Sequence, residues 1–314
     1  MTRVWWAVCL LLALFCGVVA ADLVPSYYLG LMIEVMILAL FVMSLDLLVG
    51  MVGLDSLGHA AFFGIGAYAG GLLSLHGFED VGLLLLAAIA AGLLLGIAFG
   101  VIALRAVGPY FLIITLALGY LPAALAIRWR SLTGGDDGLV LPGRPSLAGI
   151  SLDSPTRYFF FVSAIVLVCV ILMALIARSA FGLGLRGIKE NPTRMNALGY
   201  RIWHYQFVVF VIASVFASIA GALNAFYNIF ISPTDFGLER SAGALVAVIL
   251  GGAGTLIGPA IGAAVIMLLR HLVGALTQHW ALVLGLFYIA VILCAPRGLA
   301  FVLRDALTRR SSLK

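Results

Sequence analysis

Long apolar runs separated by short polar connections dominate the 314 residues of this chain. A helix of roughly 20 apolar residues crosses the hydrocarbon core of a bilayer, so each run near this length predicts a transmembrane helix. The pattern therefore predicts an all-α fold, a polytopic membrane helical bundle of about ten transmembrane segments. The runs cover residues 4–21, 27–49, 57–75, 81–104, 110–127, 158–177, 206–231, 242–250, 257–269 and 280–295.

The eighth and ninth runs are shorter than the roughly 17 residues that a full span requires. They are joined by the sequence G-G-A-G-T-L-I-G-P at 251–259, and clustered glycine and proline interrupt helices. We therefore expect two broken or re-entrant helices here, and whether 242–250 and 257–269 cross the membrane fully stays open.

Glycines spaced four residues apart predict where helices approach each other closely within the bundle. The fourth run contains a series of three such glycines, and two further runs contain a pair each. These positions are Gly92, Gly96 and Gly100, then Gly66 and Gly70, then Gly258 and Gly262.

The first run has two interpretations. Arg3 precedes an apolar stretch that ends in the small residues of V-V-A-A-D, which is also the pattern of a cleaved secretory signal. Because the chain that follows is apolar in almost every segment, we expect a retained first transmembrane helix.

A basic interval at 178–205 interrupts the apolar pattern. Its centre has the signals of a short helix over 192–198, because Asn191 is a good N-cap, Pro192 suits the first helical position and Gly199 suits the left-handed residue after the end. A helix of about seven residues is not stable alone, so it should dock on something. Two interpretations stay open: a basic membrane-anchoring loop, or a short cytoplasmic helix that another protein pushes on. The charged residues of the interval are Arg178, Arg186, Lys189, Glu190, Arg194 and Arg201.

Composition assigns the chain to the membrane class. The hydrophobic share is 64%, the charged share is 10% and the mean hydropathy is +1.21, whereas soluble domains contain about 25% charged residues. We expect residues 1–314 to form a single transmembrane domain. The net charge of +5 then reflects orientation in the membrane, not affinity for nucleic acid.

The distribution of Lys and Arg predicts the orientation. If both termini are cytoplasmic, the cytoplasmic side receives 12 of the 18 Lys and Arg residues, in agreement with the positive-inside rule. The basic interval 178–205 and the tail 296–314 are then cytoplasmic. The long connection at 128–157 is on the outer side, where its turn-rich sequence predicts at best local order.

No motif for chemistry occurs in the sequence. A phosphate-binding G-x-x-x-x-G-K-S/T loop, an H-E-x-x-H motif, paired cysteines and a G-x-S-x-G elbow are all absent from it. We therefore expect no catalytic residues, no metal site and no cofactor, and we do not expect an enzyme.

Ionisable residues inside the apolar runs are better indicators of function, because a charge at the bilayer centre costs at least about 2.5 kcal/mol. Glu34 and Asp46 lie on the second run, and Asp55 and His59 are four residues apart and can meet. One interpretation is local pairing near helix ends. The other is a polar translocation path lined by Glu34, Asp46, Ser56, His59 and Tyr68.

Five motifs in order resemble the permease subunits of branched-chain amino acid ABC importers. They cover nearly the whole chain after the first run. The motifs are S-L-G-H-A-A-F-F-G-I-G-A-Y (56–68), S-L-T-G-G-D-D-G-L (131–139), the L-R-G-I-K-E-N segment running to A-L-G-Y (185–200), I-L-G-G-A-G-T-L-I-G-P (249–259) and P-R-G-L (296–299).

This resemblance implies a multi-pass permease of the bacterial inner membrane that imports branched-chain amino acids or a related small polar solute. It implies as partners a second homologous permease, two ATP-binding cassette ATPase subunits, a periplasmic solute-binding protein and the surrounding lipid. The basic interval becomes the segment that couples to an ATPase. Its expected contact residues are Arg186, Lys189, Glu190, Asn191, Arg194, Met195, Leu198 and Gly199.

Two other classes of protein are alternatives. A secondary transporter driven by an ion gradient would use Glu34 and Asp46, as buried carboxylates often serve this purpose. A membrane-embedded enzyme would need converging nucleophile, base or metal ligands, and the sequence indicates none. Which solute moves, and whether the permease itself selects it, stay open.

Overall fold

A computed structural model describes residues 25–276, 282–283, 285–287 and 289. The predicted first helix and the predicted tail at 296–314 lie outside the described residues, and so does most of the run at 280–295. Within the described part, the chain forms a helical membrane bundle with little β structure, which confirms the predicted fold class.

Six helices in the described part are long and apolar enough to cross a membrane. Apart from the C-terminal end of α12, each begins and ends within a few residues of a predicted run, because apolar length was the signal for both. They are α2 (Ser26–Val49), α4 (Val81–Ala103), α5 (Pro109–Arg128), α7 (Pro155–Arg178), α10 (Ile202–Asn228) and α12 (Ile257–Leu276).

Shorter elements connect or complete these spans. They are α3 (Ala60–Leu75), α6 (Arg130–Thr133), α8 (Ala180–Glu190), α9 (Pro192–Ala197), α11 (Leu238–Gly251), the 3₁₀ turns η1 (Gly135–Asp137) and η2 (Pro233–Phe236), and the two-residue strands β1 (Leu139–Val140), β2 (Ser146–Leu147), β3 (Ile150–Ser151) and β4 (Phe230–Ile231).

The expectation of two short helices around 251–259 is half right. α11 has 14 residues and is too short to span a bilayer, as expected. α12 has 20 residues, because its apolar pattern continues past Arg270 and His271, and it is long enough to span. The chain therefore has one broken segment here rather than two.

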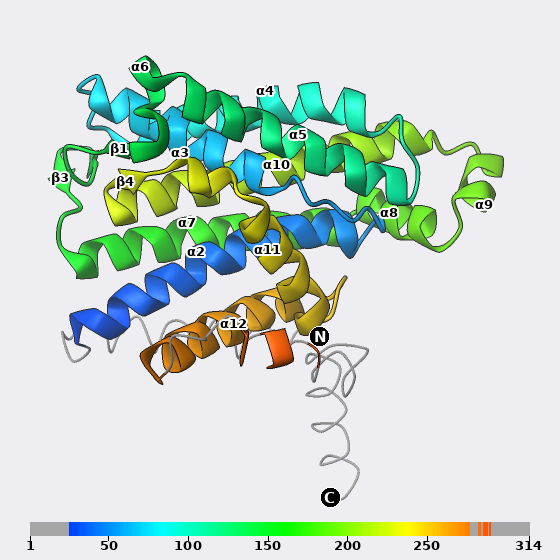
Figure 1. Ribbon diagram of the computed structural model, residues 1–314. Coiled ribbons are helices and arrows are strands. Elements are labelled where there is room, and N and C mark those ends of the chain that lie inside the picture. The colour runs from blue at the N-terminus through cyan, green and yellow to red at the C-terminus, as the bar shows by residue number, and fades with distance from the viewer. Residues whose placement is uncertain (1–24, 277–281, 284, 288, 290–314) are drawn as a thin grey trace, which may run out of the picture.

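α2 and α10 occupy the centre of the bundle, and most of their residues are buried. α10 packs against α2, α3 and α4, while α2 also packs against α7, α11 and α12. In Figure 1, α4 and α5 lie along one side of the bundle and α12 along the opposite side. A helix that is apolar all round suits such a central position.

The predicted glycine series brings α4 against α10. A side chain at Gly92 would meet Ser218, one at Gly96 would meet Ser214, and one at Gly100 would meet Phe210. The hydroxyl of Ser214 donates to the carbonyl of Gly92 at 3.0 Å, which requires this close approach of the two backbones.

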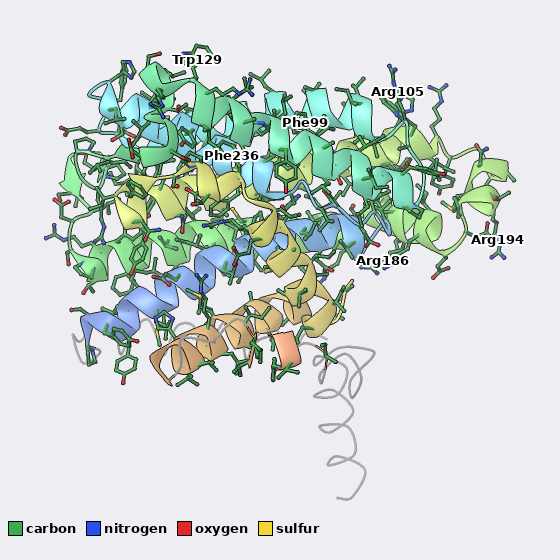
Figure 2. The ribbon with its side chains drawn as sticks, in the orientation of Figure 1. Phe99, Arg105, Trp129, Arg186, Arg194 and Phe236 are labelled. Atoms are coloured by element: carbon green, nitrogen blue, oxygen red, sulfur yellow. The ribbon has the colours of Figure 1, made fainter. Side chains whose placement is uncertain are left out.

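The two ends of the bundle differ in character. α6, β1 and β3 lie at one end, and α8 and α9 lie at the other (Figure 1). Trp129 lies at the first end, whereas Arg105, Arg186 and Arg194 all lie at the second (Figure 2). The residues that sequence analysis assigned to opposite sides of the membrane are therefore at opposite ends of the molecule.

The long connection at 128–157 is more ordered than its turn-rich sequence predicted. β1 pairs antiparallel with β4, so the connection is attached to the end of α10. The guanidinium of Arg144 lies over the rings of Tyr158 and Tyr227, at 5.1 and 5.6 Å, and Nη1 donates to the carbonyl of Asp153. Contacts with two neighbouring helices hold a segment whose own sequence carries little structural signal.

Candidate functional site

A cavity of about 800 Å³ lies between α2, α10, α11 and α12. Its wall combines charged, amide and apolar side chains, which is unusual in a bundle of this composition. The polar lining residues are Glu34, Asn224, Asn228, Thr234, Glu239, Arg240, Arg270 and His271. The apolar part of the wall includes Ile37, Leu38, Phe63, Ile266 and Met267.

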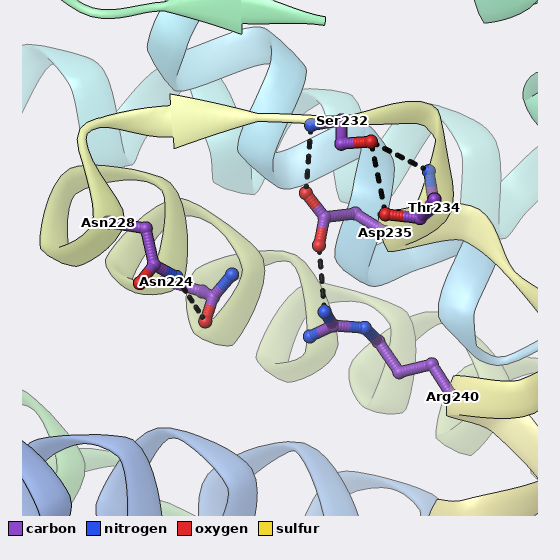
Figure 3. A network of polar contacts seen from close by, with 6 residues as sticks. All are labelled: Asn224, Asn228, Ser232, Thr234, Asp235 and Arg240. Atoms are coloured by element: carbon purple, nitrogen blue, oxygen red, sulfur yellow. Dashed lines mark hydrogen bonds and ion pairs between the residues drawn. The ribbon is translucent and has the colours of Figure 1, made fainter. Parts of the chain in front are cut away.

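One wall of the cavity is a hydrogen-bonded network (Figure 3). Nη2 of Arg240 lies 2.8 Å from Oδ1 of Asp235, and the other carboxylate oxygen of Asp235 accepts from the backbone N–H of Ser232 at 3.3 Å. On α10, Asn228 donates to Asn224 at 3.2 Å. Of these residues, the two amides and Arg240, which the ion pair holds in place, line the cavity.

η2 holds Asp235 in place through a capping box. The hydroxyl of Ser232 accepts from the N–H of Thr234 at 3.3 Å while the carboxylate of Asp235 returns to the N–H of Ser232. Asp235 is buried, and its ion pair with Arg240 joins η2 to the first turn of α11 inside the bundle.

Glu34 is the predicted path residue that reaches this cavity. It is half-buried on α2, and Arg270 and His271 of α12 are near enough to act electrostatically on its carboxylate. The cavity therefore has an acid on its α2 side, the guanidinium of Arg270 on its α12 side, and both the acid Glu239 and the paired Arg240 on its α11 side. Charges of both signs in one cavity suit a solute that itself carries both charges.

Asp46, the second predicted acid, does not line the cavity. Its carboxylate accepts from the backbone N–H of Gly254 at 2.7 Å and of Leu256 at 3.3 Å. The residue is only 1% exposed, and its two oxygens are occupied by the turn between α11 and α12. The structure therefore gives Asp46 a role in holding that turn.

Ser56 and His59 lie in a buried polar cluster away from the cavity. The hydroxyl of Ser44 donates to the carbonyl of Phe41 at 2.6 Å, so its oxygen accepts from Nε2 of His59 at 2.8 Å. The expected pairing of His59 with Asp55 is wrong, since Asp55 is exposed and His59 turns inward to α2. Ser56 is buried, and its hydroxyl accepts from the N–H of Gly58 at 3.4 Å.

Neighbouring helices fix this cluster at the start of α3. The hydroxyl of Ser241 on α11 accepts from the N–H of Ala60 at 2.8 Å, and Thr115 on α5 accepts from the N–H of Leu57 at 3.3 Å. Tyr68, one of the predicted path residues, is buried further along α3 and stacks on Phe236 with ring centroids 5.4 Å apart. The five predicted path residues are thus distributed over four places, and the structure does not bring them together.

The basic interval forms two short helices. Asn191 caps α9, accepting from the N–H of Arg194 at 2.9 Å, and Gly199 has a φ of +89°, so the predicted caps of the short helix are confirmed. α8 was not predicted, because the sequence A-F-G-L-G-L-R-G is rich in glycine, which disfavours helices. α8 is anchored through Leu185 and Ile188, whereas α9 has no buried residue and projects from the bundle.

The predicted contact residues of this interval have different surroundings. Met195 is half-buried and packs on Gly187 of α8, while Leu198 is 67% exposed. Lys189 reaches from α8 to the end of α2, where its ammonium donates to the carbonyls of Val49 and Gly50. The remaining predicted contact residues, Arg186, Glu190 and Arg194, are exposed, and Asn191 and Gly199 form the caps of α9.

Several residues of the site could not be identified from the sequence. Ser44, Thr115 and Ser241 are single hydroxyls in apolar helices, and nothing in their local sequence separates them from ordinary helix residues. Two signals were available for the cavity. Asn224 and Asn228 are amides four residues apart on an apolar run, and Asp235 and Arg240 directly precede a run too short to span.

The fold and the cavity define a class: a polytopic helical membrane protein of the transporter type, with a polar chamber inside the bundle and an ordered segment projecting from one end. Residues 27–295 match the family described as branched-chain amino acid transport system / permease component, and the chain belongs to that family.

Individual relatives agree with this membership. The chain is 29% identical over 303 residues to the high-affinity branched-chain amino acid transport system permease protein LivM of Salmonella typhimurium, covering 88% of this chain and 70% of the relative. LivM of Escherichia coli is 29% identical over 299 residues, 87% of this chain and 69% of the relative. The corresponding permease protein BraD of Pseudomonas aeruginosa is 26% identical over 241 residues, which cover 71% of this chain and 78% of the relative. No solved structure matches the chain significantly.

Proposed function

We propose that this chain is a permease subunit of an ATP-driven importer in a bacterial inner membrane, and that its solute is a branched-chain amino acid or a closely related small zwitterion. A second, homologous permease would complete the membrane channel. Two ATPase subunits would supply the energy, and a periplasmic binding protein would deliver the solute. Family membership and the names of the relatives support these partners.

The observation that carries the proposal is the projecting α9. Its exposed face includes Arg194 and Leu198, and a helix of six residues does not persist in water without a surface to dock on. The chain itself has no phosphate-binding loop. A short, capped, unburied helix at the basic end of the bundle suits a contact with a partner that binds ATP.

The cavity supports the choice of solute. An α-amino acid carries an ammonium and a carboxylate, and the cavity is lined by the carboxylate of Glu34 and the guanidinium of Arg270 within electrostatic reach of each other. The apolar surface formed by Ile37 and Ile266 would contact an aliphatic side chain. Burying such a side chain is worth about 1.5 to 3 kcal/mol, which is enough to distinguish it from a small amide.

Reconstitution in liposomes tests the proposal. The chain would be purified with its genetically linked permease, ATPase and binding-protein subunits, and uptake of labelled leucine and of urea would be measured with and without internal ATP. We expect leucine uptake that requires ATP. Uptake that follows an imposed proton or sodium gradient without ATP would contradict the proposal and favour a secondary transporter.

A further inference from the structure

We propose that Lys189 and Asp46 act together as positioning residues that connect the coupling segment, defined as α8 and α9, to the turn between α11 and α12. The connection runs through the C-terminal end of α2. It rests on the proposed function, because a displacement of the coupling segment matters only if a partner moves it. Its consequence is that one wall of the cavity moves with that segment.

The first link joins α8 to the C-terminal end of α2. The ammonium of Lys189 donates to the carbonyl of Gly50 at 2.8 Å and of Val49 at 3.1 Å. Carbonyls at a helix end have no partner within the helix, and a cation there is stabilised by the helix dipole. The aliphatic stem of Lys189 also lies against Gly53, which has a positive φ. Lys189 thus attaches α8 to the C-terminal end of α2.

The second link joins the same end of α2 to the turn at 252–256. Asp46 lies one helical turn before Gly50, and its two oxygens accept from the N–H groups of Gly254 and Leu256. Both of these residues have a positive φ, and Leu256, at +62°, is an L-residue in a region that such residues seldom occupy. A buried carboxylate that holds two N–H groups keeps this unusual turn in shape.

The two links are rigidly connected to each other. Gly50 lies so close to Gly254 that an added side chain would collide with the Gly254 backbone and with the carboxylate of Asp46. Direct contact of this kind leaves no space for the turn to move independently of the α2 end. A displacement imposed at Lys189 is therefore transferred to the turn.

The turn is positioned to change the cavity. It connects α11, which contributes Arg240 and Ala247 to the cavity wall, with α12, which contributes Ile266 and Arg270. α11 and α12 also pack directly on α2. Tilting α11 and α12 about residues 252–256 would change the separation between Arg270 and Glu34. Positioning of this kind controls how the chamber opens without any contact between Lys189 or Asp46 and the solute.

The test compares the ratio of solute imported to ATP hydrolysed in the reconstituted complex. Lys189→Met removes the two hydrogen bonds to the end of α2 at an exposed position, so folding should be retained, and binding of the ATPase is measured in the same complex. We expect ATP hydrolysis to continue while the transport ratio falls about ten-fold, the effect of losing one charge-assisted hydrogen bond. Lys189→Arg keeps a donor at the same place and should restore most of the ratio.

Two further variants separate this connection from a general effect of charge or stability. Arg201→Met is the matched control, because Arg201 is an exposed basic residue of the same interval, directly before α10, and is not among the expected contacts with the ATPase. It should keep the wild-type ratio. Asp46→Asn should lower the ratio as Lys189→Met does, and the double variant should be no worse than the more affected single one, because both residues act in series.

The possible outcomes are distinct. A normal ratio in Lys189→Met, in a complex whose wild type couples ATP to uptake, would overturn the connection and leave the proposed function intact. An equal loss in Arg201→Met would also overturn it, because the effect would then be one of charge. Failure of the wild-type complex to use ATP for uptake would contradict the proposed function itself.

Discussion

Arg240 and Asp235 form an ion pair, with Nη2 and Oδ1 2.8 Å apart, that closes one side of the cavity. The guanidinium also lies over the ring of Phe63, 4.3 Å from its centroid. The pair links η2 to α11, two consecutive elements that are separated only by Gly237. Its first role is therefore structural, and Arg240 reaches a solute only as part of a neutral pair.

Removing one partner of this pair should destabilise the protein more than removing both. Arg240→Met leaves the carboxylate of Asp235 buried without its cation, which costs about 3 to 5 kcal/mol when a buried pair is broken. We expect a lower midpoint of thermal unfolding in detergent for Arg240→Met than for the double variant Arg240→Met with Asp235→Asn. Equal midpoints would show that the two residues are not coupled.

Neutralising Glu34 should weaken solute binding without affecting assembly. If its carboxylate faces the ammonium of an amino acid, Glu34→Gln removes a charge-assisted contact worth about 1.5 to 3 kcal/mol, so the KM for uptake should rise about ten-fold or more. The control is Glu79→Gln, because Glu79 is an exposed acid outside the cavity. Unchanged uptake in Glu34→Gln would remove Glu34 from the path.

The spans could be predicted from the sequence because the signal for a membrane helix is local. Twenty apolar residues specify a crossing wherever they occur, so α4 and α7 begin and end almost where their apolar runs do. Capping is equally local, and the ends of α9 followed from Asn191 and Gly199. The length of α12 was underestimated, since Arg270 and His271 resemble a helix end but are turned to the cavity.

The polar site could not be predicted in the same way, because its geometry depends on which helices meet. Asp46 resembles a path residue in sequence, yet its partners Gly254 and Leu256 are more than 200 residues away. Asp55 and His59 have the spacing of a helical pair, but α3 begins only at Ala60, so no helical turn joins them. Tertiary packing alone decides such contacts.

Labelling with a membrane-impermeant thiol reagent should establish the orientation. In a variant without the native cysteines, Ser146→Cys lies in β2 at one end of the bundle, and Val107→Cys, 82% exposed in the native residue, lies between α4 and α5. The charge distribution predicts that intact cells label the first and that only inverted vesicles label the second. The reverse pattern would place the coupling segment outside the cell.

Enlarging a glycine between α4 and α10 should destabilise the bundle. Gly96→Val would force a side chain against Ser214, and overpacking of this kind costs about 1 to 3 kcal/mol. Gly274→Val in α12 is the matched control, because a side chain there meets no atom within 4 Å. Thermal unfolding in detergent should show a lower midpoint for the first variant alone, and equal midpoints would mean that α4 and α10 do not pack as closely as the structure has them.

The last prediction concerns the docking face of α9, and the structure changes which residue tests it. Met195 packs on Gly187 of α8, so a charge placed there would disturb the contact between the two helices as well as any partner. Leu198 is 67% exposed at the end of α9, so replacing it removes little packing within the chain.

Leu198→Asp should therefore leave the permease folded and weaken its binding to the ATPase subunit. An apolar side chain buried in an interface contributes about 1.5 to 3 kcal/mol, so we expect the dissociation constant for the ATPase subunit to rise at least about ten-fold. Leu183→Asp is the control: Leu183 is 63% exposed on α8 but outside α9. If both variants bind the ATPase as the wild type does, α9 is not the docking face, and the basic end of the bundle serves only to set the orientation.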